Sequence, residues 1–259
     1  MAILELKNTT TYKTRLGDLD GKGASADVVV GGSDPSKFIP NINISRCDNE
    51  VFLNLNFGKS IVTNEKHLFS DGKVSINVGG IDHTQYIKDK KNSEWELSFA
   101  ERPDCESFEF DMVHSDSLSF YFMPPLEDQY ARDTEGMTWE EYQKLYTVDP
   151  KAVGGYTVYH NKRNNKYKAG KFLTIWPPWF IDAHGDRKKG IVKVNEEKKQ
   201  LIITCDKLWL DNAAYPVVLD PTIGYTSVGT YGNIAATYSY TWAGNTYNAT
   251  EDGIMYFSK

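Results

Sequence analysis

One acidic stretch near the N-terminus has spacing that could hold a cation. The residues Gly17-Asp18-Leu19-Asp20-Gly21-Lys22-Gly23 resemble half of an EF-hand loop. Aligning Gly21 with the invariant glycine of that loop puts Asp18, Asp20 and Asp27 at the third, fifth and twelfth positions. Leu16 then takes the first position and supplies no oxygen. A solvated hairpin turn is the better interpretation, with a looser calcium loop as the alternative.

A second polar cluster, Asp182-Ala183-His184-Gly185-Asp186, offers three ligand side chains within five residues. The basic run Arg187-Lys188-Lys189-Gly190 follows it directly, which is more typical of a turn between two strands. None of the five histidines has the i, i+4 spacing of a helical metal pair. We therefore assign no metal site and no cofactor site.

Nucleophilic chemistry has little support. His114-Ser115-Asp116-Ser117 lacks the glycine-rich elbow that exposes a catalytic serine. Cys47, Cys105 and Cys205 are isolated along the chain, so we expect three buried thiols in a protein that folds in a reducing compartment. One disulfide with a spare thiol is the alternative. The prediction is that the protein is not an enzyme and has no catalytic residues. A hydrolase that uses some pair among the 35 carboxylates remains the alternative.

Trp176-Pro177-Pro178-Trp179 is a candidate carbohydrate platform. Two tryptophans held by stiff prolines could stack against the face of a sugar ring. The competing interpretation, which we favour, is that both tryptophans fill the edge of a β-sandwich.

Composition excludes some classes of protein. A formal net charge of −6 and a pI near 5.4 argue against nucleic-acid binding, which favours a basic surface. No apolar run is long enough to predict a membrane span, and residues 1–18 lack the pattern of a secretory signal. We expect synthesis in the cytoplasm without a signal peptide.

The elements that must position these residues are mostly strands. Apolar and polar residues alternate along Val51–Phe57, Trp95–Phe99, Phe108–Phe110 and Leu118–Phe122. This period of two is typical of antiparallel strands with one wet face, and Gly-Gly and Asp-Gly pairs between strands indicate turns. The predicted fold is mostly β, with antiparallel β-sandwich-like sheets.

One helix interrupts the predicted strands, at about residues 137–147. Thr138 and Glu141 have the spacing of a capping box, and Trp139, Tyr142 and Tyr146 share one helical face. We predict a β-rich globular unit over residues 1–224 with this helical insertion.

Residues 225–259 have a different composition, with many Gly, Thr, Tyr, Ser and Asn residues and no charge before Glu251. We expect an arm that docks on a neighbour, or the start of a following β-module. Aromatic, charge-poor surfaces are typical of interface cores. The predicted interface residues are Tyr225, Tyr231, Tyr238, Tyr240 and Trp242.

The stretch Tyr215-Pro216-Val217-Val218-Leu219-Asp220-Pro221-Thr222 reads as a last, short strand. Pro216 sets its entry and Val217–Leu219 are expected to be buried. Because proline supplies no backbone donor, we expect Asp220-Pro221 to end the ladder.

Several motifs in a fixed order resemble a known group of proteins. They are Phe108–Asp111 with Leu118–Leu126, Val153–His160, Gly170–Pro178 and Leu210–Thr226, which includes the Tyr-Pro-Val…Asp-Pro-Thr stretch. Together they resemble uncharacterised β-rich proteins of tailed phages, prophages and metagenomic contigs, over roughly residues 100–226. Met123 departs from the glutamine that precedes the paired prolines in those relatives.

The resemblance carries no catalytic residue and implies a virion or surface structural protein. We therefore expect a non-enzymatic structural or host-attachment component of a phage-like particle or a cell-surface assembly. It would act through subunit packing, in a virion or at an extracellular surface. Its expected partners are further copies of itself or other particle and surface proteins, with no nucleic acid and no membrane insertion. The alternative is a carbohydrate-binding module that uses Trp176 and Trp179 to bind host glycans.

Overall fold

The computed structural model describes residues 4–7, 12–16, 26–31, 38–46, 49–57, 66–88, 92–133, 136–145, 150–160, 170–224, 239–242 and 245–248. The chain divides into two compact units. Unit 1 comprises Met1–Asp116 with Pro177–Gly224, and unit 2 comprises Ser117–Trp176 with Tyr225–Lys259. The predicted division of the chain at residue 224 stays a prediction.

Unit 1 contains an eight-stranded antiparallel sheet, which we call sheet A. Its order is β1-β2-β3-β4-β5-β10-β17-β16. The strands are β1 (Glu5–Leu6), β2 (Tyr12–Leu16), β3 (Ala26–Gly31), β4 (Ile39–Arg46), β5 (Val51–Phe57), β10 (Ser107–His114), β17 (Gln200–Thr204) and β16 (Ile191–Asn195).

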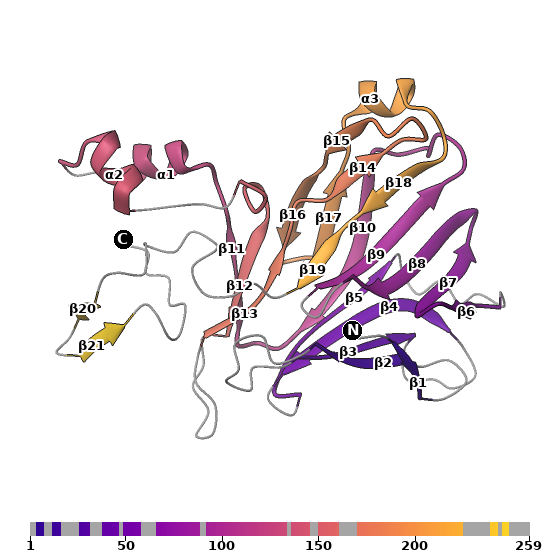
Figure 1. Ribbon diagram of the computed structural model, residues 1–259, viewed down its shortest axis with the longest axis horizontal. Helices are drawn as coiled ribbons and strands as arrows, with labels where there is room; N and C mark the ends of the chain where they lie inside the picture. Colours follow the sequence, from indigo (N-terminus) through magenta and orange to yellow (C-terminus); the bar gives the residue numbers. More distant parts are fainter. Residues whose placement is uncertain are drawn as a thin grey trace. The chain divides into compact units, whose positions relative to one another are not determined.

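The second sheet of unit 1, sheet B, runs in the order β6-β7-β8-β9, then β18 and β19 together, then β14-β15. These strands are β6 (Leu68–Ser70), β7 (Lys73–Val78), β8 (Ile81–Ile87), β9 (Asn92–Phe99), β18 (Val217–Asp220), β19 (Thr222–Gly224), β14 (Trp179–Ile181) and β15 (Arg187–Lys189). Figure 1 shows the strands of both sheets in unit 1, with helix α3 (Lys207–Asn212) at one end of it.

The two sheets pack face to face through aromatic rings. Trp95 of sheet B meets Phe110 of sheet A edge-on, with ring centroids 5.2 Å apart. Phe99 and Phe108 make a second contact between the sheets at 4.8 Å. Burying rings of this size is a main source of stability in a sandwich core. The predicted antiparallel β-sandwich-like fold is confirmed.

The predicted periodicity holds in β5 but not in β11, where Phe120 is half-buried and Phe122 is exposed. In β5, Val51, Leu53 and Leu55 are buried, while Phe52 and Asn54 are half-exposed. The Asp-Gly turn signal also holds, because Asp71 and Gly72 connect β6 to β7 with φ of 52° and 72°. Positive φ at both central residues is what a two-residue hairpin requires.

The expectation that Asp220-Pro221 ends the ladder is wrong, although β18 itself ends at Asp220. β18 pairs with β9 through Val217 to Leu219. After Pro221, the chain pairs with β9 again through Thr222, Ile223 and Gly224. Pro221 lacks an N–H, but its carbonyl still accepts from Trp95 N at 3.5 Å. Pro221 therefore interrupts the ladder along β9 between β18 and β19 and does not end it.

Unit 2 contains a three-stranded antiparallel group, β11 (Leu118–Phe122), β12 (Tyr156–His160) and β13 (Gly170–Ile175). It also contains helices α1 (Leu126–Asp133) and α2 (Trp139–Leu145) and the hairpin of β20 (Ser239–Trp242) with β21 (Asn245–Asn248).

The predicted helical insertion is α2, and its capping box is present. Glu141 Oε2 accepts from Thr138 N at 2.9 Å, and Thr138 Oγ1 accepts from Glu141 N at 3.3 Å. Tyr142 is buried, and its ring stacks with Trp139 and meets Tyr130 edge-on. Helices α1 and α3 were not expected from the sequence. No described helix is long and apolar enough to cross a membrane.

Candidate functional site: an acidic row on sheet B

Three carboxylates that lie far apart in the sequence gather on one face of sheet B. On β9, Trp95 and Leu97 point into the core, so Glu94 and Glu96 lie on the other face. Asp220 follows Leu219, which is paired with Leu97, and so shares the face of Glu96. We call Glu94, Glu96 and Asp220 the acidic row.

Glu94 is fully buried, which is rare for a glutamate without compensating partners. Its Oε1 atom lies 2.6 Å from Lys88 Nζ and accepts a hydrogen bond from Thr222 Oγ1 at 2.8 Å. Among the described residues, its Oε2 atom is buried without a hydrogen-bond partner, and so is Oδ1 of Asp220. Half of this carboxyl group is therefore satisfied and half is not.

The electrostatics of Glu94 favour its neutral form. Burial, and then the adjoining Asp220 carboxyl, raise the pKa of Glu94 to about 8, against the opposing effect of Lys88 and Thr222. A carboxyl that keeps its proton near neutral pH is the usual state of a general acid.

Tyr86 of β8 covers the other end of the acidic row. Its hydroxyl donates to Glu96 Oε1 at 2.6 Å, and Lys73 Nζ lies 4.2 Å from the centre of its ring. Burial, followed by the hydrogen bond to Glu96, raises the pKa of the Tyr86 phenol well above its usual range. Tyr86 is thus a fixed hydrogen-bond donor at any ordinary pH.

Trp179 continues the same cross-strand line beyond Asp220. Trp179 on β14 is paired with Asp220 on one side and with Lys189 on the other, and 40% of its surface is exposed. Trp176 belongs to unit 2, where it is partly buried and packs against Met123 and Ala152. Of the two tryptophans predicted as a sugar platform, Trp179 is the exposed one.

The acidic row resembles a hydrolase pair in composition, but Glu94 has no exposed surface through which a substrate could reach it. Within the described ranges, no group of three or more His, Cys, Asp or Glu side chains is placed to hold a metal ion. The arrangement can hold a proton and can join neighbouring strands through side-chain contacts.

In the polar turn after β14, the side chain of Asp182 accepts hydrogen bonds from nearby backbone groups. Oδ1 of Asp182 accepts from the backbone N of His184 and of Asp186, both at 2.9 Å, and Oδ2 accepts from Ala214 N at 3.0 Å. These hydrogen bonds lower the pKa of Asp182, and the bond from Ala214 N has the largest effect. The turn interpretation of residues 182–186 is thus the one that the geometry supports.

Ser115 also has a structural environment. Its Oγ accepts from Phe52 N at 2.8 Å and donates to Glu50 O at 3.2 Å, which ties the end of β10 to β5. Cys205 is buried as expected, and burial raises its pKa to about 11. The expectation for Cys105 is wrong, because that thiol is exposed in the loop between β9 and β10. Cys47 lies outside the described residues.

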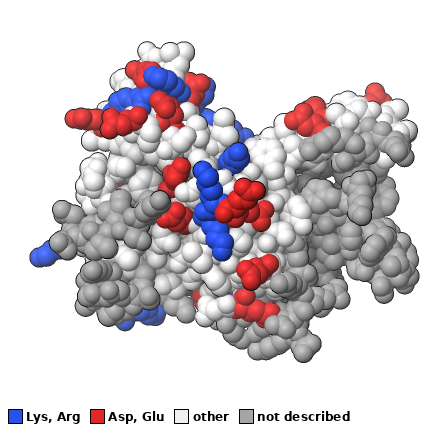
Figure 2. Space-filling view, turned by 180° about the vertical axis from the view of Figure 1, so that it is seen from behind, with Lys and Arg blue, Asp and Glu red and all other residues white. Residues whose placement is uncertain are grey.

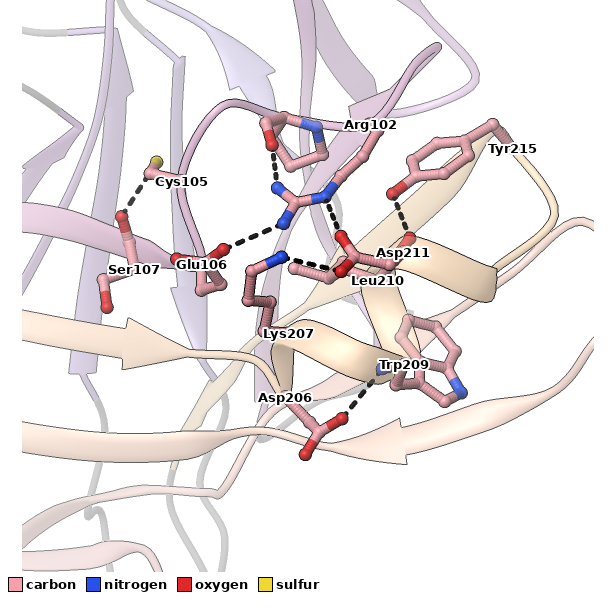
Figure 3. Close-up of polar contacts among 11 residues, drawn as sticks. Arg102, Cys105, Glu106, Ser107, Asp206, Lys207, Trp209, Leu210, Asp211 and Tyr215 are labelled. Atoms are coloured by element: carbon pink, nitrogen blue, oxygen red, sulfur yellow. Dashed lines mark hydrogen bonds and ion pairs between the residues drawn. The ribbon is translucent and has the colours of Figure 1, made fainter.

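A surface network joins that loop to α3 (Figure 3). Arg102 Nε donates to Asp211 Oδ1 at 2.9 Å, its Nη2 donates to Glu106 Oε1 at 2.8 Å, and its Nη1 donates to the Pro103 carbonyl. Lys207 Nζ adds a second contact to Asp211 at 2.7 Å. The face shown in Figure 2 has Lys and Arg side chains beside Asp and Glu side chains, so its described residues form no continuous basic surface.

Several predicted site residues have no described side chains. The Gly17–Gly23 loop and Tyr225, Tyr231 and Tyr238 lie outside the described residues, and only the backbone of Tyr240 and Trp242 is placed, in β20. Their roles stay predictions.

Comparison with known proteins adds no assignment. No protein-family model matches the sequence, and neither the curated proteins nor the solved structures gave a match. The fold and the site therefore define only a class, a two-sheet antiparallel sandwich with a buried glutamate, Glu94, in its acidic row.

Proposed function

We propose that the protein is a non-enzymatic structural or attachment component of a larger particle or surface assembly, and that it acts by packing against copies of itself. The observation that carries this proposal is the composition of the edge strand β6. Leu68 is 70% exposed and Phe69 is 43% exposed on this strand, which lies at the margin of unit 1 (Figure 1).

The two edges of sheet B differ in a way that favours pairing at β6. The edge strand β15 consists of Arg187, Lys188 and Lys189, and basic residues on an edge discourage pairing with another chain. Strand β6 reads Leu-Phe-Ser and, among the described strands, pairs with β7 alone. An apolar edge strand without charges can pair its free backbone N–H and C=O groups with a strand of a second chain.

The test is a charge placed on that edge. The variant Leu68→Lys should lower the assembled mass measured by light scattering and sedimentation velocity over a range of concentrations, because a lysine opposes both burial and strand pairing. Leu208→Lys is the matched control, since Leu208 is 71% exposed but lies on α3. A wild-type protein that stays monomeric at all concentrations, or a Leu68→Lys variant that assembles normally, would refute the proposal.

A carbohydrate-binding module is the second candidate, favoured by the exposure of Trp179 beside Asp220. An indole face next to a carboxylate is suited to stacking on a sugar ring and accepting a hydroxyl bond. On a glycan array, Trp179→Ala should abolish binding while Trp176→Phe retains it. Binding that survives Trp179→Ala, or no binding by the wild type, counts against this candidate.

A further inference from the structure

The carboxyl groups of Glu94 and Asp220 bring together more buried hydrogen-bond acceptors than donors. Within the part of the chain that the structure describes, Glu94 Oε2 and Asp220 Oδ1 are both buried without a hydrogen-bond partner. Two ionised carboxylates are acceptors only, so neither can satisfy the other. A single proton placed on Glu94 Oε2 supplies the missing donor and removes one buried charge.

The surroundings of Glu94 agree with a neutral carboxylic acid. Oε1 already accepts from Lys88 and Thr222, as the carbonyl-like oxygen of a protonated carboxyl group does, which leaves Oε2 as the O–H donor. Lys88 favours the charged form, but half of its side chain is in solvent, which weakens its attraction.

The neighbouring polar groups that the structure describes on β7, β8 and β14 do not supply that donor. On β8, the Tyr86 hydroxyl donates to Glu96, the other acidic group on β9. On β7, Lys73 lies over the ring of Tyr86. Beyond Asp220, the paired residue on β14 is Trp179, which is uncharged.

We propose that Glu94 and Asp220 share one proton, and that this proton holds β18 and β19 against β9. Alkaline solution removes the proton and thereby loosens both strands from β9. Asp220 is the last residue of β18, and Thr222, which also contacts Glu94, is the first residue of β19. The proton thus lies where Pro221 interrupts the backbone ladder, and the side chains reconnect the interrupted strand to its partner.

The sign of the pH dependence follows from linkage. The folded protein holds the Glu94 proton up to about pH 8, whereas an unfolded glutamate releases it near 4.5. The stabilisation is complete below pH 4.5, declines as pH rises, and is gone above about pH 8.

The decisive comparison is wild type against Glu94→Gln. The amide keeps an oxygen for Lys88 and Thr222 and an N–H for Asp220, but it cannot titrate. The ratio of the wild-type to the variant unfolding constant, measured in urea by fluorescence, should rise by up to about tenfold per pH unit between pH 5 and 8. Glu109→Gln, which changes an exposed glutamate on β10, should keep the wild-type pH profile.

Infrared spectroscopy gives a readout that does not depend on stability. At pH 7 the wild type should show the carbonyl stretch of a protonated carboxyl, which disappears in Glu94→Gln and fades above about pH 8. If that band is absent at pH 7, or if the unfolding ratio is flat from pH 5 to 8, the shared proton is refuted. Both results are independent of whether the protein assembles.

Discussion

His83 shows how one buried side chain determines a response to acid. It is 1% exposed and lies between the ring of Phe57, at 4.8 Å, and that of Trp95. The indole N–H of Trp95 donates to His83 Nδ1 at 3.2 Å, and since an indole can only donate, this nitrogen carries no proton. Burial lowers the pKa of His83 to about 4.

We predict that the His83 imidazole stays neutral at pH 6 and titrates only near pH 4. Because an unfolded histidine takes up its proton near pH 6.5, the stabilisation from neutral His83 is present above pH 6.5 and lost as pH falls toward 4. A pH titration of the histidine ring resonances by NMR checks this. A normal titration curve for His83 would contradict it.

The acidic row and His83 act in opposite directions between pH 4.5 and 6.5. Neutral His83 gains stabilising effect as pH rises, while the Glu94 proton loses it. Because both proteins contain His83, the ratio of wild type to Glu94→Gln isolates the contribution of the Glu94 proton across the whole range.

At the scale of elements, Gly190 is where the chain passes from β15 in sheet B to β16 in sheet A. Its backbone N donates to the Pro178 carbonyl at 2.8 Å. A Cβ at this position would lie 2.9 Å from Cε2 of Phe180 and 3.0 Å from Cγ of Pro178. The corner of the sandwich therefore depends on a residue without a side chain.

We predict that Gly190→Ala lowers the free energy of unfolding by about 1–3 kcal/mol, because the fully buried Phe180 ring must shift. Phe180→Leu should cost less in the Gly190→Ala background than in the wild type, since the smaller side chain leaves room for the methyl group. Urea unfolding of the two single variants and the double variant measures the coupling. Additive effects would show that the close approach to Phe180 is not the cause.

At the scale of the whole molecule, the proposed assembly has two separate sources: the β6 edge and the aromatic residues after Gly224. If Tyr225, Tyr231, Tyr238, Tyr240 and Trp242 supply subunit contacts, a chain that ends at Gly224 should have a lower assembled mass by light scattering. Surfaces that act independently give additive losses, so Leu68→Lys in the truncated chain should lower the mass further. If the assembled mass is unchanged after truncation, residues 225–259 do not contribute to the assembly.

The sequence predicted the elements better than it predicted the site. Alternation in Val51–Phe57 and the capping box at Thr138 are local signals, and the structure confirms both. Helix α3 was not expected because its start depends on Asp206, whose side chain accepts from Trp209 N, within a stretch too short for a helical period. Glu94 carries no local signal at all.

The sequence by itself determined the class of fold, because the side chains of a strand alternate between two faces and the order of apolar residues states which face is buried. Only the tertiary structure decided that Glu94 meets Asp220, since 126 positions separate them and strand register brings β9 beside β18 and β19. A buried carboxyl is recognised by what surrounds it in space, and cross-strand neighbours are not encoded in the spacing of residues along the chain.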